Sequence, residues 1–307
     1  MELTERYLNP YTDFGFKRLF GEEMNKDLLL SFLNAIFEGQ QKIKNISYLR
    51  NEHLGTVEED RKAVFDVYCE NEHGEKFIVE MQKAEQKFFK DRSVFYSTFP
   101  IREQAKRGKW DFELKAVYSI SILNFVFDEN KNNSNYFYHE AKIMNTRTKE
   151  VFYDKLTFIY FEMPKFNKTE SELETLSDKW LYVLKNLPRL LDRPVALQER
   201  VFERVFHLAE ISRFNKQEID QYEESLKVFR DINNVIDTAE EKGLRKGLAQ
   251  GRAEGLAEGI EKGLAEGMAK GLTKGKLEIA RNMKQAGMPV EQIALFTGLP
   301  AGEIDKL

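Results

Sequence analysis

Two apolar runs, FDVYCEN (65–71) and EKFIVEMQK (75–83), constrain the fold of this 307-residue chain more than any other feature. Both are rich in the aliphatic and aromatic residues typical of strands, and three residues join them. The joining residues, Glu72, His73 and Gly74, match a hairpin loop in which a type I turn is followed by a glycine in the left-handed region. The sequence therefore predicts an antiparallel hairpin here.

An acidic residue interrupts each run, Asp66 in the first and Glu80 in the second. A three-residue loop pairs Asn71 with Glu75, and counting outward along both strands places Asp66 opposite Glu80. The Cβ atoms of opposed residues lie about 4.5–5.5 Å apart, where like charges destabilise a sheet. A divalent cation would remove this repulsion, and two carboxylates with water molecules are usual ligands of Mg²⁺. Strand alternation places Gln82 on the same face as Glu80.

Two interpretations of these acids stay open on spacing alone. In the first, Asp66 and Glu80 hold Mg²⁺, which lowers the pKa of a bound water and stabilises charge on a phosphodiester, so the chemistry is metal-dependent phosphodiester hydrolysis. In the second, Asp66 faces solvent on an edge hairpin and Glu80 pairs with a lysine.

The region around the hairpin predicts a mixed α/β domain over residues 1–168, because helical and strand patterns alternate along it. Short amphipathic helices are expected at 9–21 and 25–37, and a polar-rich helix at 85–107. The near-continuous apolar run 116–127 is typical of a central strand buried on both faces. Further strands are expected at about 45–53, 62–71, 75–83, 136–145 and 156–163.

From about residue 170 the chain changes to charged amphipathic helices. We expect an all-helical C-terminal region, divided into helices over 169–242, a repeat over 243–275 and a short helical tail over 276–307. Glycine occupies every fourth position of the repeat, mostly followed by Leu, Ile or Met. Two copies that pair through these glycines would form a homodimer; the alternative is a flexible or frayed helical spacer, because each interior glycine costs about 1 kcal/mol relative to alanine.

Composition excludes several classes of protein. A formal net charge of −4 excludes a globally basic nucleic-acid coat, so any DNA contact requires a local cluster of cations. Cys69 is the single cysteine and the four histidines are scattered, which argues against a disulfide and against structural zinc. No apolar run reaches the roughly 18 residues of a membrane span. We therefore expect a cytoplasmic protein with no membrane partner.

Several segments together resemble the Rpn family of recombination-promoting nucleases, often labelled putative transposases of the PD-(D/E)XK superfamily. They are TDFGFKRLFG (12–21), the hairpin, KFFKDRSVFYS (87–97), the glycine repeat and EQIALFTGLPAGEIDKL (291–307). The resemblance implies a restriction-endonuclease-like mixed sheet flanked by helices in residues 1–168. It also implies a Mg²⁺-dependent DNA endonuclease linked to recombination or mobile elements. Asp66 then matches the first metal-binding acid, and Glu80 the acid of the (D/E)-x-K motif.

The motif lysine is replaced by Gln82, which can orient a water or a phosphate oxygen but carries no positive charge. A second hypothesis therefore stays open: a catalytically weak or inactive nuclease-fold protein that acts as a DNA-binding or self-association module. Full transposase chemistry is favoured less, because the sequence contains no separate domain for recognising element ends.

Residues outside the hairpin complete the predicted site. Asp13 is either an accessory outer-shell ligand or the N-cap of the first helix, a role that Thr12 could also fill. Lys83, Lys87 and Lys90 recur at helical spacing, while strand alternation directs Lys83 away from Glu80. We expect Lys87, Lys90 and Arg92 to contact DNA phosphates, which position DNA without reading its sequence.

Overall fold

The structure, a computed structural model, describes residues 5–50, 52–53, 63–105, 111–131 and 136–307. The chain divides into two compact units, Met1–Ile236 and Asp237–Leu307.

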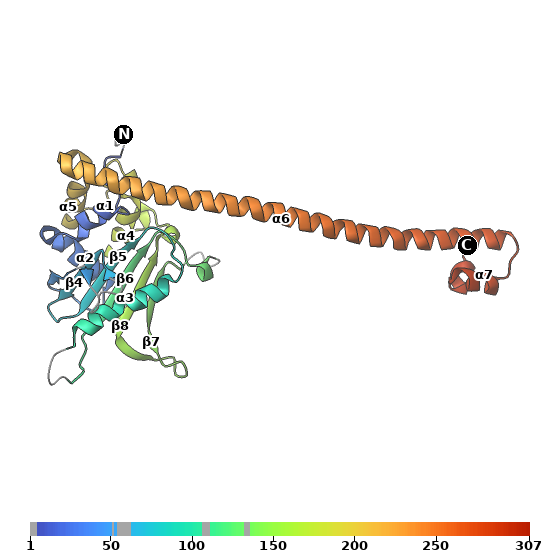
Figure 1. Cartoon of the computed structure of the whole chain (residues 1–307), viewed down its shortest axis with the longest axis horizontal. Coiled ribbons are helices and arrows are strands. Elements are labelled where there is room, and N and C mark those ends of the chain that lie inside the picture. The colour runs from blue at the N-terminus through green and yellow to red at the C-terminus, as the bar shows by residue number, and fades with distance from the viewer. Residues whose placement is uncertain (1–4, 51, 54–62, 106–110, 132–135) are drawn as a thin grey trace. The chain divides into compact units, whose positions relative to one another are not determined.

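The first unit is built on a six-stranded mixed sheet (Figure 1), with strand order β1-β4-β5-β6-β8-β7. Neighbouring strands β5, β6 and β8 run parallel, and the other pairs in the sheet are antiparallel. The apolar run 116–127 supplies β6, one of the two central strands, as its composition predicts. The strands are β1 (Ile46–Tyr48), β4 (Val67–Asn71), β5 (Lys76–Gln82), β6 (Val117–Leu123), β7 (Tyr138–Met144) and β8 (Val151–Glu162).

Helices cover both faces of this sheet, and strand alternation decides which side chains each face receives. On β5, Phe77, Val79 and Met81 enter the main core, which also contains apolar residues of the helices α1, α2, α4 and α5 and of the first turns of α6. Ile78 points to the opposite face, where it packs with Phe99 of α3. Figure 1 shows α3 crossing this face. The helices are α1 (Asp13–Phe20), α2 (Lys26–Ile36), α3 (Phe89–Glu103), α4 (Leu176–Asn186), α5 (Arg200–Ala209) and α6 (Lys216–Gln285).

The predicted register of the hairpin is confirmed. Tyr68 pairs with Ile78, and the backbone N–H of Asn71 donates to the carbonyl of Glu75 at 3.0 Å. Gly74 has φ +77°, the left-handed conformation that glycine adopts without strain. The loop length therefore sets which side chains of the two strands share a face.

Three expectations about element boundaries are wrong. The run 62–71 is broken into β3 (Ala63–Val64) and β4, so Asp66 lies in the bend between them and not in a strand. The run 45–53 likewise forms β1 and a separate β2 (Glu52–His53). The helix expected at 85–107 begins only at Phe89, so Lys83 and Lys87 precede α3 and do not belong to one helical face with Lys90.

The second unit contains the glycine repeat, which is helical throughout as part of α6, and a small C-terminal core. The core residues Ala280, Ile293, Leu299 and Ile304 come from the end of α6, from α7 (Val290–Thr297), from α8 (Ala301–Ile304) and from the turn between them. A Cβ added at any glycine of the repeat would meet no atom within 4 Å beyond the neighbouring helix backbone. In the described part of the chain, no helix is long and apolar enough to cross a membrane.

Candidate active site

Glu80 is a buried carboxylate on the face of β5 that α3 covers. Its residue is only 4% exposed. Gln82, two positions along the same face, donates its amide N–H to Glu80 Oε2 at 3.4 Å. The guanidinium of Arg92, on α3, lies 3.8 Å from the same oxygen. The sheet and the covering helix thus each supply one polar neighbour to Glu80.

Asp66 reaches the same place from the bend before β4. Because Val67 pairs with Val79, the register carries Asp66 to the level of Glu80. The backbone N–H of Met81 donates to Asp66 Oδ2 at 2.8 Å, which ties this carboxylate to β5 beside Glu80. The two acids therefore lie beside each other, as predicted. A hydrogen bond between its side chain and the backbone of β5 holds Asp66 there, and strand pairing does not.

Proximity and burial disfavour the ionised forms of both acids. Burial is the main cause that raises the pKa of Glu80 to about 7, and the charge of Asp66 acts in the same direction, while Arg92 and Gln82 oppose it. Burial also raises the pKa of Asp66, against the hydrogen bond from Met81. Perturbed carboxylates of this kind cluster at functional sites.

Asp13 belongs to the same neighbourhood and is not the helix cap. The N-cap of α1 is Thr12, whose hydroxyl accepts a hydrogen bond from the backbone N–H of Gly15 at 3.0 Å. Asp13 forms an ion pair with Lys17 at 3.1 Å, and its charge contributes to the raised pKa of Asp66. The capping role considered for Asp13 is therefore wrong, and its side chain lines a pocket together with Asp66.

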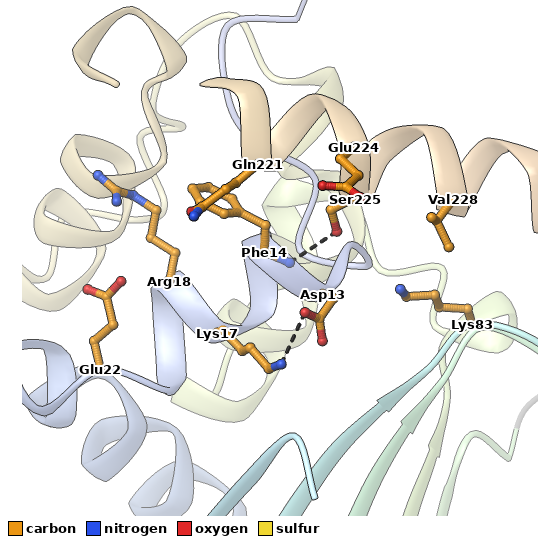
Figure 2. Close-up of a pocket in the computed structure, with 10 residues that line it drawn as sticks. All are labelled: Asp13, Phe14, Lys17, Arg18, Glu22, Lys83, Gln221, Glu224, Ser225 and Val228. Atoms are coloured by element: carbon orange, nitrogen blue, oxygen red, sulfur yellow. Dashed lines mark hydrogen bonds and ion pairs between the residues drawn. The ribbon is translucent and has the colours of Figure 1, made fainter. Parts of the chain in front are cut away.

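A pocket of about 200 Å³ opens beside the acids, and its walls include Asp13, Asp66, Gln82 and Lys83. A neighbouring pocket of about 480 Å³, between α1 and the first turns of α6, shares Asp13 and Lys83 with it (Figure 2). In Figure 2, Lys83 extends from the end of β5 towards the side where Asp13 lies.

Lys83 is a site residue that sequence reasoning missed. Strand alternation places it on the face opposite Glu80, and there it lines the pocket with Asp13, Asp66 and Met81. The charge of Lys83 lowers the pKa of Asp66, against the larger effect of burial. Its position directly after the E-x-Q sequence is the signal that could have identified Lys83.

The three predicted phosphate contacts occupy different environments. Lys90 forms an ion pair with Glu129 and lies over the ring of Phe127, with 4.5 Å between its Nζ and the ring centroid. Lys87 is exposed and lies 5.1 Å from the ring centroid of Phe88.

Arg92 is positioned by two aromatic rings, those of Phe89 and Tyr96, each with its centroid 5.3 Å from the guanidinium carbon. The structure therefore brings Arg92 to the acids and leaves Lys87 and Lys90 outside the immediate site. The contact between Arg92 and Glu80 joins a helix to a strand, so residue spacing could not reveal it.

The side chains present fit a hard divalent cation. Among the described residues, no group of three or more His, Cys, Asp and Glu side chains is placed to hold a metal. Asp66 and Glu80 offer two carboxylates, and Mg²⁺ is typically bound by one or two carboxylates with water completing its shell. The raised pKa of Glu80 fits as well, because a cation would relieve the repulsion that contributes to it.

A mixed sheet that presents an aspartate before one strand and an E-x-Q sequence on the next defines a nuclease-like fold of the PD-(D/E)XK type. The family model described as "PD-(D/E)XK nuclease family transposase" matches residues 10–239. The chain belongs to this family, which confirms the predicted superfamily and fold. Searches of curated proteins and of solved structures find no match.

The raised pKa of Glu80 predicts a pH-dependent cost to stability. Between the ordinary value of 4.5 and about 7, the folded state holds a proton that the unfolded state has lost, so the free energy of unfolding falls as pH rises through this range. In EDTA, Glu80→Gln should match the wild type near pH 4.5 and exceed it at pH 8 by up to about 3 kcal/mol in urea unfolding. The exposed Glu85→Gln serves as the control. Equal stability of Glu80→Gln and wild type at both pH values would contradict the assigned pKa.

Proposed function

We propose that this protein is a Mg²⁺-dependent DNA endonuclease of the Rpn type, linked to DNA recombination or mobile elements. The observation that carries the proposal is the buried carboxylate of Glu80 beside Asp66, with a pKa raised by burial and by like charge. Family membership supports a nuclease that acts on DNA. The endonuclease activity and the choice of Mg²⁺ are our proposal.

Asp66 and Glu80 would hold the metal ion, with Asp13 as an accessory acid beside Asp66. When bound, Mg²⁺ supplies a lowered pKa for the attacking water and stabilises the charge that develops on the phosphodiester. The hydrogen bond from Met81 fixes one oxygen of Asp66, so this carboxylate is oriented before the metal arrives.

We assign the roles of a motif lysine to three residues, Gln82, Arg92 and Lys83. The amide of Gln82 orients Glu80 and can hydrogen-bond a water or a phosphate oxygen. Arg92 and Lys83 supply the positive charge that glutamine lacks, from α3 and from the end of β5. Because Arg92 lies against two aromatic rings, little conformational freedom remains to be lost when it meets a phosphate.

The second candidate is a nuclease-fold module with weak or no catalysis that binds DNA or copies of itself. Gln82 favours it, since no positive charge stands at the motif position itself. Both candidates share the remaining assignments: DNA phosphate contacts through Lys87, Lys90 and Arg92, a homodimer formed through the helical C-terminal half, and a cytoplasmic location.

Plasmid nicking separates the two candidates. With Mg²⁺, wild-type protein should nick supercoiled plasmid, and Asp66→Ala and Glu80→Ala should each reduce the rate by at least about 100-fold, because each removes a metal ligand. Glu85→Gln should nick at the wild-type rate. Equal nicking by all variants would refute the site, and no nicking by the wild type would favour the module.

DNA affinity tests the phosphate contacts. Lys87→Glu should weaken binding across all sequences and reduce the salt dependence of the association constant by about one unit of slope, because a lost phosphate contact releases fewer counterions. Lys90→Glu should have a smaller effect, since Glu129 already neutralises Lys90. Arg147→Glu, in the exposed turn between β7 and β8, is the control. If Lys87→Glu left affinity and slope unchanged, the assignment would fail.

A further inference from the structure

The glycine repeat of α6 carries three parallel rows of side chains. Residues adjacent in sequence lie about 100° apart around a helix, so the glycine row is flanked by the residues that follow each glycine on one side and those that precede it on the other. From Gly255 to Gly271 the following residues are apolar, namely Leu256, Ile260, Leu264, Met268 and Leu272, and Arg252 and Lys276 flank this run. The preceding residues are charged: Glu254, Glu258, Lys262, Glu266, Lys270 and Lys274.

The apolar row is an unpartnered face of this helix. Leu264 is 63% exposed and Met268 76%, and the other three members are also exposed. The open space at each glycine would let a second backbone approach closely between the two flanking rows. Burial of exposed apolar side chains provides the free energy for such an approach.

Symmetry distinguishes the two ways in which identical helices can pair through the glycine row. In a parallel pair the two-fold axis runs along the helices, so the apolar row of one copy lies against the charged row of the other. In an antiparallel pair the axis is perpendicular to the helices. Apolar row then meets apolar row on one side, and charged row meets charged row on the other. The antiparallel arrangement is favoured, because it avoids burying charges against apolar side chains.

The order of charges supports the same orientation. The charged row reads Glu-Glu-Lys-Glu-Lys-Lys. When this order is reversed, every Glu stands opposite a Lys and every Lys opposite a Glu. With Leu264 at the centre, antiparallel pairing opposes Glu254 to Lys274, Glu258 to Lys270, and Lys262 to Glu266. Each opposition occurs twice by symmetry, so the charges match along the whole row.

We propose that residues 254–274 of α6 bind the same segment of a second copy in an antiparallel homodimer centred near Leu264. This deepens the self-association proposed above and rests on it. Each four-residue step advances about 40° around the helix, so the rows wind and contact is closest near the centre. The pairs of Lys262 with Glu266 and of Glu258 with Lys270 therefore contribute most.

Disulfide trapping in the full-length chain tests the orientation, with Cys69→Ser as background. Ile260 faces Met268 of the second copy in the antiparallel pair, whereas in a parallel pair each lies against the charged row of the other copy. After mixing and oxidation, tagged Ile260→Cys and untagged Met268→Cys chains should form the mixed disulfide at least about tenfold more than either self-disulfide, and Leu264→Cys should form its self-disulfide. Absence of the mixed product from a dimeric sample, with or without self-disulfides, would overturn the antiparallel pairing.

Sedimentation of charge variants gives an independent measurement. Glu258→Lys should weaken the dimer at least about tenfold, and adding Lys270→Glu should restore most of the affinity. Within one helix, Glu258 pairs with Lys262 at 2.5 Å and Glu266 with Lys270 at 3.4 Å. Lys270→Glu alone should weaken the dimer as Glu258→Lys does, so a gain in affinity when the two are combined reports a contact between copies. Failure to recover would contradict the proposed register.

The outcomes separate this inference from the proposals on which it rests. A wild-type chain that sediments as a monomer at about 100 μM would overturn both the antiparallel pairing and the proposed self-association. A dimer that gives only self-disulfides keeps the self-association and refutes the orientation. Failure of plasmid nicking would affect the endonuclease proposal alone.

Discussion

A buried carboxylate, Glu80, and a half-buried one, Asp66, lie beside each other and repel, and the rest of the site is organised around this unfavourable pair. The three-residue loop ending in Gly74 fixes the register, and the backbone N–H of Met81 then holds Asp66 against β5. Asp66 cannot move away from Glu80 without losing this hydrogen bond, and burial together with the charge of Asp66 raises the pKa of Glu80 to about 7. A bound cation would convert the same geometry into a favourable interaction.

The cations around the acids show how the fold tolerates this arrangement before any metal binds. Arg92 approaches Glu80 from α3 and Lys83 approaches Asp66 from the end of β5, so neither needs the motif position that Gln82 occupies. Charge near a scissile phosphate depends on where a side chain ends in space, and two elements that approach the acids from different sides can supply it as well as one. Gln82 then serves as an orienting group.

Much of the fold follows from local pattern, whereas the contacts that complete the site do not. Loop length predicted the pairing of Tyr68 with Ile78, and the apolar run around Ile120 predicted a central strand. Asp66 lies in the bend before β4 and not in the strand, so strand patterning did not predict the hydrogen bond that holds it. The contact of Arg92 with Glu80 depends on how α3 crosses the sheet, which no spacing encodes. In the glycine repeat, the spacing of four residues places similar side chains in rows along a helix. Leu264 is exposed, so the apolar row is uncovered in the single chain.

The central claim is that register brings Asp66 and Glu80 together as one cation site. Mn²⁺, which takes the same oxygen ligands as Mg²⁺, reports on it directly, because the paramagnetic resonance signal of free Mn²⁺ disappears on binding. At pH 8 the account predicts binding that Mg²⁺ competes away and that is lost in both Asp66→Asn and Glu80→Gln. Affinity should weaken below pH 7 as Glu80 becomes protonated. Unchanged Mn²⁺ binding in these two variants, or none in the wild type, would contradict the account.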